Sequence, residues 1–322
     1  MSTPPARGRR NKTVERALLL LSAIFGMLLI VLWLLPRTGR PSVGADAPEA
    51  GTPTGPAAGP GPERSRGTSG QSEVVSLDDS RVPQKPSPSS DHGPGALGAL
   101  AFVIDDAGGS LEMMARYLAF PGKLTISVLP GLIASQEVAM QAIAAGKDVI
   151  LHCPMEAVNG ANPGPGAIYS DSTRDEVLRT LTENLASVPL AVGINNHMGS
   201  RVTADPVIMG VVMEFLSQEG MFFLDSKTTP DSVARILAEE YNVPFLERDV
   251  FVDNIRDSEQ IMTWIEHAKE IATRRGYAVL IGHASSEQTI EVIESTYADL
   301  LRSGFRLIGL VDLLRLTTGG EP

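Results

Sequence analysis

Acidic, amide and imidazole side chains recur between residues 105 and 283, each group after a short apolar segment. The adjacent pair Asp105 and Asp106 ends the first of these segments. The later segments are followed by His152 with Glu156, by Asn195, Asn196 and His197, by Asp225, by Asp249 and Asp253, and by His283. Carboxylates and three histidines at the ends of successive segments favour a shared site.

These residue types suit one kind of chemistry. Neutral imidazoles together with a carboxylate are ligands that zinc or a similar divalent ion prefers. Such an ion lowers the pKa of a bound water towards about 7, which makes a hydroxide available at neutral pH. A carboxylate beside that water takes its proton, and an imidazole across the site protonates the leaving group. The residues therefore predict a metal-assisted hydrolase.

The apolar segments have the length and composition of buried β-strands, and helical patterns lie between them, at residues 173–186, 206–218, 258–275 and 286–302. The predicted strands are residues 100–104, 124–129, 149–152, 191–195, 221–225, 244–252, 278–282 and 305–310. This alternation predicts an α/β fold, a TIM-like (β/α) barrel of seven to eight parallel strands. An open doubly wound sheet is the alternative, although no glycine-rich phosphate-binding loop follows the first strand.

The C-terminal ends of parallel strands gather their polar residues on one face. Adjacent residues of a strand point to opposite faces, so Cys153 should face away from the site if His152 faces it. We therefore predict that Cys153 is a buried thiol and not a nucleophile. His267 lies inside a helical pattern and is predicted to be structural, whereas Tyr169, in a Gly- and Pro-rich loop, is a candidate for gripping a substrate.

Residues 17–35 form an apolar stretch without a charge, long enough to cross the roughly 30 Å hydrocarbon core of a bilayer. One acidic residue, Glu15, and five basic residues precede it: Arg7, Arg9, Arg10, Lys12 and Arg16. Such a basic excess normally stays in the cytoplasm. We predict a cytoplasmic basic segment at residues 1–16 and a transmembrane signal anchor at residues 17–35. A cleaved signal peptide is the alternative, because small residues follow near Ala45.

Composition divides the rest of the chain. Residues 36–95 contain 11 Pro and 10 Gly, so residues 36–96 are predicted to be a disordered linker. The folded domain is predicted at residues 97–316, with a tail at residues 317–322. A net charge of −11 argues against a nucleic-acid partner bound by broad phosphate neutralisation. The single cysteine excludes an internal disulfide and a Cys-rich zinc module.

Six ordered motifs resemble the divergent polysaccharide deacetylase family, envelope proteins distantly related to NodB-type carbohydrate esterases. They are IDDAG at 104–108, LHCPME at 151–156, GINNHMGS at 193–200, LDSKTT at 224–229, RDVFVD at 248–253 and IGHA at 281–284. The resemblance covers essentially the whole predicted domain. It implies a metal-dependent carbohydrate deacetylase, a hydrolase of carbon–nitrogen bonds other than peptide bonds.

The resemblance also implies roles for single residues. Asp105 matches the general base of NodB-type enzymes, Asp106 a metal ligand, and His283 the general acid. The NodB metal motif HxxxH reads HCPME here, with Glu156 in place of the second His. We expect Asp106, His152 and His197 to hold the metal, most simply zinc.

Four further residues are expected to contact substrate or to support those that do. Glu156 is expected near the substrate, as a fourth ligand or as a partner that orients a ligand. Asp225 could orient a catalytic partner or bind a sugar hydroxyl. Asn195 and Asn196 are candidate amide donors to the substrate, although each could instead fix its loop.

Motifs and N-terminal signals together predict a membrane-tethered enzyme that removes N-acetyl groups from envelope glycan or peptidoglycan fragments by attack of a metal-bound water. The anchor would place the domain in the bacterial periplasm, tethered by one pass through the inner membrane. The altered HxxxE motif supports the alternative, a weak or inactive deacetylase-like domain that binds glycan or an envelope partner. Hydrolysis of a non-sugar amide or ester is compatible with the same residues.

Overall fold

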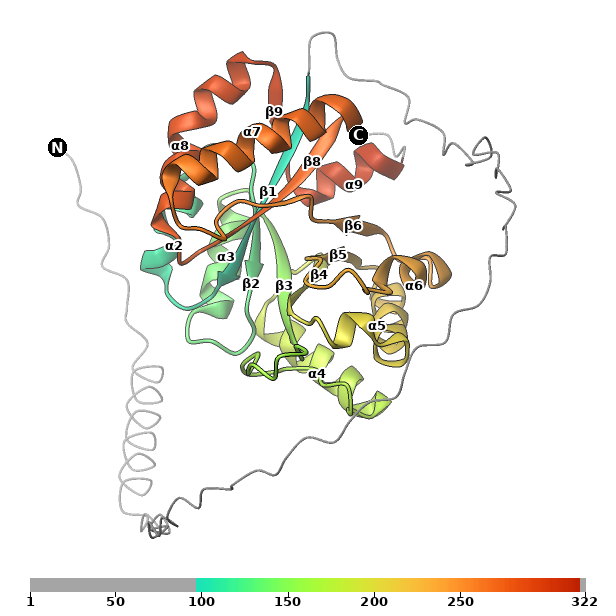
Figure 1. Cartoon of the computed structure of the whole chain (residues 1–322). Helices are drawn as coiled ribbons and strands as arrows, with labels where there is room; N and C mark the ends of the chain where they lie inside the picture. The colour runs from blue at the N-terminus through green and yellow to red at the C-terminus, as the bar shows by residue number, and fades with distance from the viewer. Residues whose placement is uncertain (1–96, 319–322) are drawn as a thin grey trace, which may run out of the picture. The chain divides into compact units, whose positions relative to one another are not determined.

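Parallel strands form the centre of residues 97–318, the part of the chain that this computed structural model describes. One sheet contains the strands β1 (Gly98–Ala107), β2 (Thr125–Val128), β3 (Asp148–Met155), β4 (Gly193–Met198), β5 (Phe222–Asp225), β6 (Phe245–Glu247), β7 (Val250–Phe251), β8 (Tyr277–His283) and β9 (Phe305–Leu307). Figure 1 shows helices arranged around the outside of these strands. The predicted α/β class is confirmed.

The strand order distinguishes a barrel from a doubly wound sheet. The order is β6-β5-β4-β3-β2-β1-β8-β7, with β9 also paired to β1. Consecutive strands are neighbours, and β1 closes against β8 along seven residue pairs, from Ala99 with Tyr277 to Asp105 with His283. A doubly wound sheet would instead reverse its order at a switch point. Within residues 97–318 no ladder joins β6 to β7, so the sheet is a TIM-like barrel that stays open there.

The opening corrects one prediction. Residues 244–252 were expected to be a single strand, but they form β6, which pairs with β5, and β7, which pairs with β8. Between the two, the backbone N–H of Arg248 donates to the carbonyl of Asp225, and that of Asp249 donates to Val279. The backbone changes partners at these two residues, and a switch of partner leaves no periodic signal in the side chains.

The helices cover the strands on the outside and begin and end at residues suited to these positions. They are α2 (Leu111–Ala119), α3 (Ser135–Ala144), α4 (Arg174–Ser187), the 3-10 turn η1 (Val202–Ala204), α5 (Pro206–Glu219), α6 (Ala234–Glu240), α7 (Ser258–Arg275), α8 (Glu287–Arg302) and α9 (Leu310–Thr318). Thr173 caps α4 in a capping box with Glu176, and Asp205 caps α5 ahead of Pro206. Gly220 and Gly276 end α5 and α7 in the left-handed conformation.

Two apolar clusters occupy opposite faces of the sheet. The larger lies between strands and outer helices, and from β1 it takes Leu100, Phe102 and Ile104. The smaller lies inside the barrel and takes the alternating residues Ala101 and Val103, closed from one end by α9. This period of two decides which polar residues face inwards where each strand ends.

None of the helices within residues 97–318 is both long enough and apolar enough to span a membrane. The predicted cytoplasmic segment, anchor and linker lie outside the described residues. The last helix runs to Thr318, two residues past the predicted domain end.

Asp249 should matter for stability, because it holds the backbone where the chain crosses the opening. Its carboxylate accepts the N–H of Val279 at 2.8 Å and pairs with Arg275, with little solvent exposure. We expect Asp249→Ala to lower the free energy of unfolding by about 1–3 kcal/mol, since a buried N–H loses its acceptor. Urea unfolding of the full chain measures this.

The control is Asp299→Ala, which removes an exposed ion pair with Arg302. That change should cost less than about 1 kcal/mol. Equal losses in the two variants would mean that the crossing does not depend on Asp249.

Candidate metal centre and active site

The alternation of side chains carries four polar residues to the inner face of the barrel. Ala101 and Val103 of β1 are followed by Asp105, and Val279 and Ile281 of β8 by His283. In the same way Ile150 of β3 is followed by His152, whereas Ile194 of β4 faces outwards and leaves Asn195 facing in. His152 and Asn195 are register partners on neighbouring strands.

Cys153 lies on the opposite face from His152. It is fully buried in the outer apolar cluster, and burial raises the pKa of its thiol to about 12. The structure thus confirms that the thiol is buried and faces away from His152, and its lack of a nucleophilic role stays a prediction. His267, on α7, is about half exposed and faces Glu270 at 3.8 Å.

Asp106 would point outwards in a regular strand, but β1 is irregular at that residue. The register between β1 and β2 shifts between Ile104 and Ala107, and Asp106 has φ of 60°. Asp is one of the few residue types that tolerate this left-handed conformation. The bulge lets two successive carboxylates, Asp105 and Asp106, reach the same site.

Three side chains converge beside this bulge. Oδ1 of Asp106 lies 3.2 Å from Nε2 of His152 and 3.1 Å from Nδ1 of His197. The two ring nitrogens are 3.1 Å apart. Within residues 97–318 these three form the one cluster of potential metal ligands whose atoms all lie within 4.8 Å of one another.

The spacing of these atoms fits a divalent ion. A tetrahedral zinc with bonds of about 2.0–2.1 Å separates its ligand atoms by about 3.3 Å. Oδ1 of Asp106 is also the one buried side-chain oxygen in residues 97–318 that accepts no hydrogen bond of good geometry. A buried carboxylate oxygen needs a partner, and a cation between the three atoms would supply it.

The electrostatics of the cluster point the same way. Burial alone would raise the pKa of Asp106, but His152 and His197 outweigh it and hold that pKa far below its usual value. Burial would lower the pKa of His152, but Asp105 and Asp106 raise it above its usual value. Both pKa shifts arise because buried carboxylates face the imidazole rings. This negative charge favours the binding of a cation.

Asp105 lies beside the cluster without belonging to it. It is buried, its Oδ1 accepts the side-chain N–H of Asn195 at 2.9 Å, and its Oδ2 lies 3.7 Å from Nε2 of His152. Asp105 thus turns one oxygen towards the metal ligands. This is the position in which a carboxylate can act as a base next to the ion.

His283 lies next to Asp105 on the neighbouring strand and is held by Asp253. Its Nδ1 lies 2.7 Å from Oδ1 of Asp253, whose other oxygen accepts the backbone N–H of His283 and the hydroxyl of Thr289. Burial alone would lower the pKa of His283, but Asp253 outweighs it and raises that pKa to about 9. The ring is therefore protonated at neutral pH and can act as an acid.

Phe251 forms one wall of the site. Its ring stacks on His283 with centroids 5.7 Å apart, and the Arg248 guanidinium lies 3.9 Å from its ring centroid. Arg248 donates to the carbonyls of Ser226 and Lys227, which keeps it in place. The stack covers one face of the His283 ring, while Asp253 holds the ring at its edge.

The remaining predicted residues are engaged within the protein. Glu156 accepts from the backbone and hydroxyl of Ser170 and pairs with Arg201 at 3.0 Å, so it ties loops together and is not part of the three-residue cluster. Asp225 is buried and accepts from the Lys227 N–H and the Ser232 hydroxyl.

The two predicted amide donors are both buried. Asn196 bonds the carbonyl of Met198 and the N–H of Ser226, which favours the alternative that it fixes its loop. Asn195 is also bonded on all sides within the protein. Tyr169 is 40% exposed, and its side-chain role stays a prediction.

Sequence reasoning assigned no role to Asp253 or Ser127. Asp253 was noted among the residues at strand ends, but its bond to His283 joins residues 30 apart. Ser127 lies inside β2 and donates to Asn195, and no local pattern separates it from an ordinary strand serine. The RDVFVD motif was the signal for Asp253.

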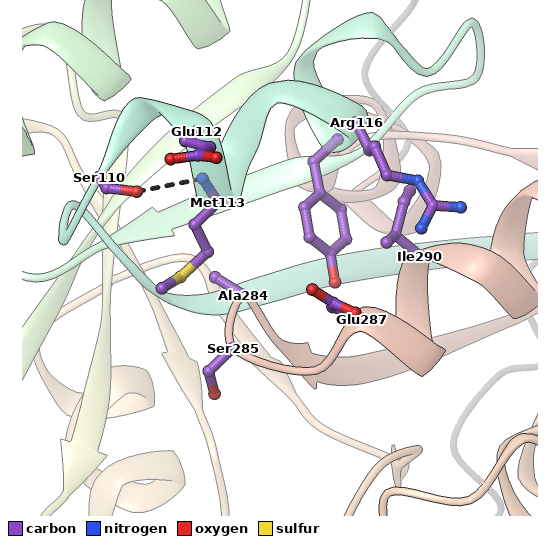
Figure 2. A pocket seen from close by; sticks show the side chains of 9 residues that line it. Ser110, Glu112, Met113, Arg116, Ala284, Ser285, Glu287 and Ile290 are labelled. Carbon is purple, nitrogen blue, oxygen red and sulfur yellow. Dashed lines mark hydrogen bonds between the residues drawn. The ribbon is translucent and has the colours of Figure 1, made fainter.

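A pocket of about 470 Å³ adjoins this site. Figure 2 shows it between α2, which contributes Met113 and Arg116, and the start of α8, which contributes Glu287 and Ile290. Ala284 and Ser285, directly after His283, also line it. The lining thus combines carboxylates, hydroxyls, a guanidinium and apolar side chains, and it reaches the site through the residues that follow His283 in the chain.

The sequence profile of the divergent polysaccharide deacetylase family matches residues 102–314. The chain is 31% identical over 220 residues to an uncharacterized protein of Haemophilus influenzae, which covers 68% of this chain and 78% of that protein. It is 32% identical over 207 residues to the uncharacterized protein YibQ of Escherichia coli, covering 64% of this chain and 65% of YibQ. The crystal structure of the uncharacterized protein ATU2773 from Agrobacterium tumefaciens aligns with a TM-score of 0.63 and 21% identity over 67% of this chain and 89% of that one, which supports the fold.

Removing either imidazole of the cluster should remove the metal. We expect the purified full chain to hold one zinc per molecule, and His152→Ala and His197→Ala to weaken zinc binding by more than about 100-fold. Loss of a partner that only supports a ligand already costs about 10–100-fold. Elemental analysis and a competing chromophoric chelator measure this.

His267→Ala is the matched control, because that imidazole is exposed on α7. It should leave the zinc content unchanged. An unchanged zinc content in His197→Ala would show that His197 does not replace the second histidine that the HCPME motif lacks.

Asp253→Asn should change the protonation of His283. In the zinc-free protein the wild-type ring should stay protonated up to about pH 9, and the variant should titrate about two units lower or more. The His283–Asp253 pair should make its full contribution to the free energy of unfolding below about pH 6.5 and lose it as pH rises through about 9. The reason is that the pKa of His283 is raised in the folded state relative to the unfolded state. Histidine NMR titration and urea unfolding at several pH values measure the two effects.

An unshifted His283 titration in Asp253→Asn would contradict the assignment of Asp253 as the cause.

Proposed function

Because the chain belongs to the divergent polysaccharide deacetylase family, we propose that its domain is a metal-dependent hydrolase that removes N-acetyl groups from envelope carbohydrate. The observation that carries the proposal is the convergence of Asp106, His152 and His197 beside a carboxylate at Asp105, with a protonated imidazole, His283, next to Asp105 on the neighbouring strand. Zinc is the metal that we assign, since its preferred ligands are these and its geometry fits their spacing.

A divalent ion bound here would supply Lewis-acid chemistry, lowering the pKa of a water and polarising the amide carbonyl. Asp105 takes the proton of the attacking water through Oδ2, the oxygen that faces the ligands. The water adds to the acetyl carbon, and the carbon–nitrogen bond then breaks. The products are acetate and a free amino group on the sugar.

His283 supplies the proton that the leaving nitrogen needs. Its raised pKa, about 9, keeps it protonated at neutral pH, and Asp253 and Phe251 fix the ring. Asp105 and His283 are register partners on adjacent strands, so base and acid approach the amide from neighbouring positions.

The pocket beside His283 supports a carbohydrate substrate. Its volume, about 470 Å³, is in the range of small-molecule sites. Glu112 and Glu287 can accept sugar hydroxyl groups, and Met113 and Ile290 offer a wall for apolar ring faces. We assign this pocket to sugar units next to the one that loses its acetyl group.

The location of the enzyme is part of the proposal. The apolar stretch at residues 17–35 and the basic residues before it support a single-pass anchor in the bacterial inner membrane. The domain would then work in the periplasm, where peptidoglycan and its fragments are the available glycans.

Acetate release tests the function. Zinc-loaded full chain should release acetate from chitin oligosaccharides or peptidoglycan fragments, and more slowly from a single N-acetylated sugar that leaves the pocket empty. Asp105→Asn should lower kcat by about 100- to 10,000-fold because the general base is lost, while zinc stays bound.

Absence of acetate release from every glycan by the zinc-loaded wild type would contradict the proposal. Glycan binding without turnover, retained in Asp105→Asn, would instead identify the domain as a glycan-binding module.

A further inference from the structure

We propose that Asn195 is a positioning residue whose side-chain amide serves two partners, its oxygen fixing the His152 ring for metal binding and its nitrogen holding Asp105 for proton transfer. The first half concerns metal binding alone. The second half rests on the proposed function.

Asn195 is fully buried in the middle of the site and uses its whole hydrogen-bonding capacity. Its Oδ1 lies 2.7 Å from the hydroxyl of Ser127 and 2.9 Å from Nδ1 of His152. Its Nδ2 donates to Oδ1 of Asp105 at 2.9 Å and to the hydroxyl of Ser226 at 3.2 Å. An amide has two donor hydrogens and two acceptor lone pairs, and all four are matched here.

The partners decide which way the amide points. An ionised carboxylate only accepts hydrogen bonds, so the nitrogen must face Asp105. The oxygen then faces His152 and can only accept, so Nδ1 of His152 must carry the hydrogen. This tautomer leaves the lone pair on Nε2, the atom that faces Asp106 and His197.

The other end of the amide restrains the base. With Oδ1 of Asp105 bonded to Asn195, Oδ2 is the oxygen left facing the cluster, 3.7 Å from Nε2 of His152. Asn195 is neutral, so it orients this carboxylate without placing a competing positive charge beside a metal site. One rigid amide thereby fixes the position of the base relative to a metal ligand.

Two substitutions separate the two ends. Asn195→Asp keeps the shape and the acceptor for His152 and Ser127. Its second oxygen would lie about where Nδ2 now lies, 2.9 Å from Oδ1 of Asp105, so the two carboxyl groups must share a proton and Asp105 is no longer a free base. We expect zinc to bind this variant no more than about threefold more weakly than wild type, while kcat for acetate release falls about 100-fold or more. Asn195→Ala removes both ends, so zinc affinity should fall about 10–100-fold along with kcat.

Asn184→Asp is the matched control for placing a carboxylate at a buried amide. Asn184 lies on α4, bonds the carbonyl of Gly166 and sits beside Cys153, on the opposite face of the sheet from His152. It should keep both zinc affinity and kcat. Urea unfolding of each variant shows whether it folds.

Ser127→Ala is a milder change than Asn195→Ala, because it removes only one donor to the amide oxygen. We expect its zinc affinity to fall about threefold or more.

Equal zinc loss in Asn195→Asp and Asn195→Ala would overturn the assignment of the amide oxygen. Unchanged kcat in Asn195→Asp, or a crystal structure of Asn195→Ala with Asp105 unmoved, would overturn the assignment of the amide nitrogen. Failure of the proposed function would be seen separately, as zinc-loaded wild-type protein that releases no acetate. In that case the comparison of zinc affinities still tests the role of the amide oxygen, and the crystal structure still tests the role of the amide nitrogen.

Discussion

Three atoms that carry lone pairs, Oδ1 of Asp106, Nε2 of His152 and Nδ1 of His197, are held within 3.2 Å of one another, and the organisation of the site depends on this contact. A single shared proton can join only two of them at a time. A divalent cation satisfies all three. Strands β1, β3 and β4, each paired on both sides, keep the three side chains from moving apart. The barrel thus provides the restraint that a metal site with few ligands requires.

The two groups next to the ligands, Asp105 and His283, are held by chemically different partners. Asp105 is oriented by a neutral amide, whereas His283 is held by the carboxylate of Asp253. A neutral donor leaves Asp105 able to accept a proton, and a carboxylate keeps His283 protonated. A carboxylate held by a neutral amide next to an imidazole whose pKa is raised by a second carboxylate is an arrangement suited to a base and an acid.

Much of this site follows from the sequence because it depends on local periodicity. A period of two places His152 inwards and Cys153 outwards, and parallel strands bring their ends together. The break between β6 and β7 does not follow, since it depends on backbone pairing with distant strands. Nor does the engagement of Glu156 by Ser170 and Arg201, because partners far apart in the chain decide where a surface carboxylate turns.

Anomalous diffraction from a zinc-soaked crystal of the protein would test the central claim most directly. The account predicts one strong zinc peak between Asp106, His152 and His197, about 2.0–2.1 Å from each ring nitrogen and about 2.0–2.2 Å from the carboxylate oxygen. Zinc peaks confined to other places would contradict it. The two imidazoles and the carboxylate would then be joined by shared protons, and the domain would not be a metal-dependent enzyme at this site.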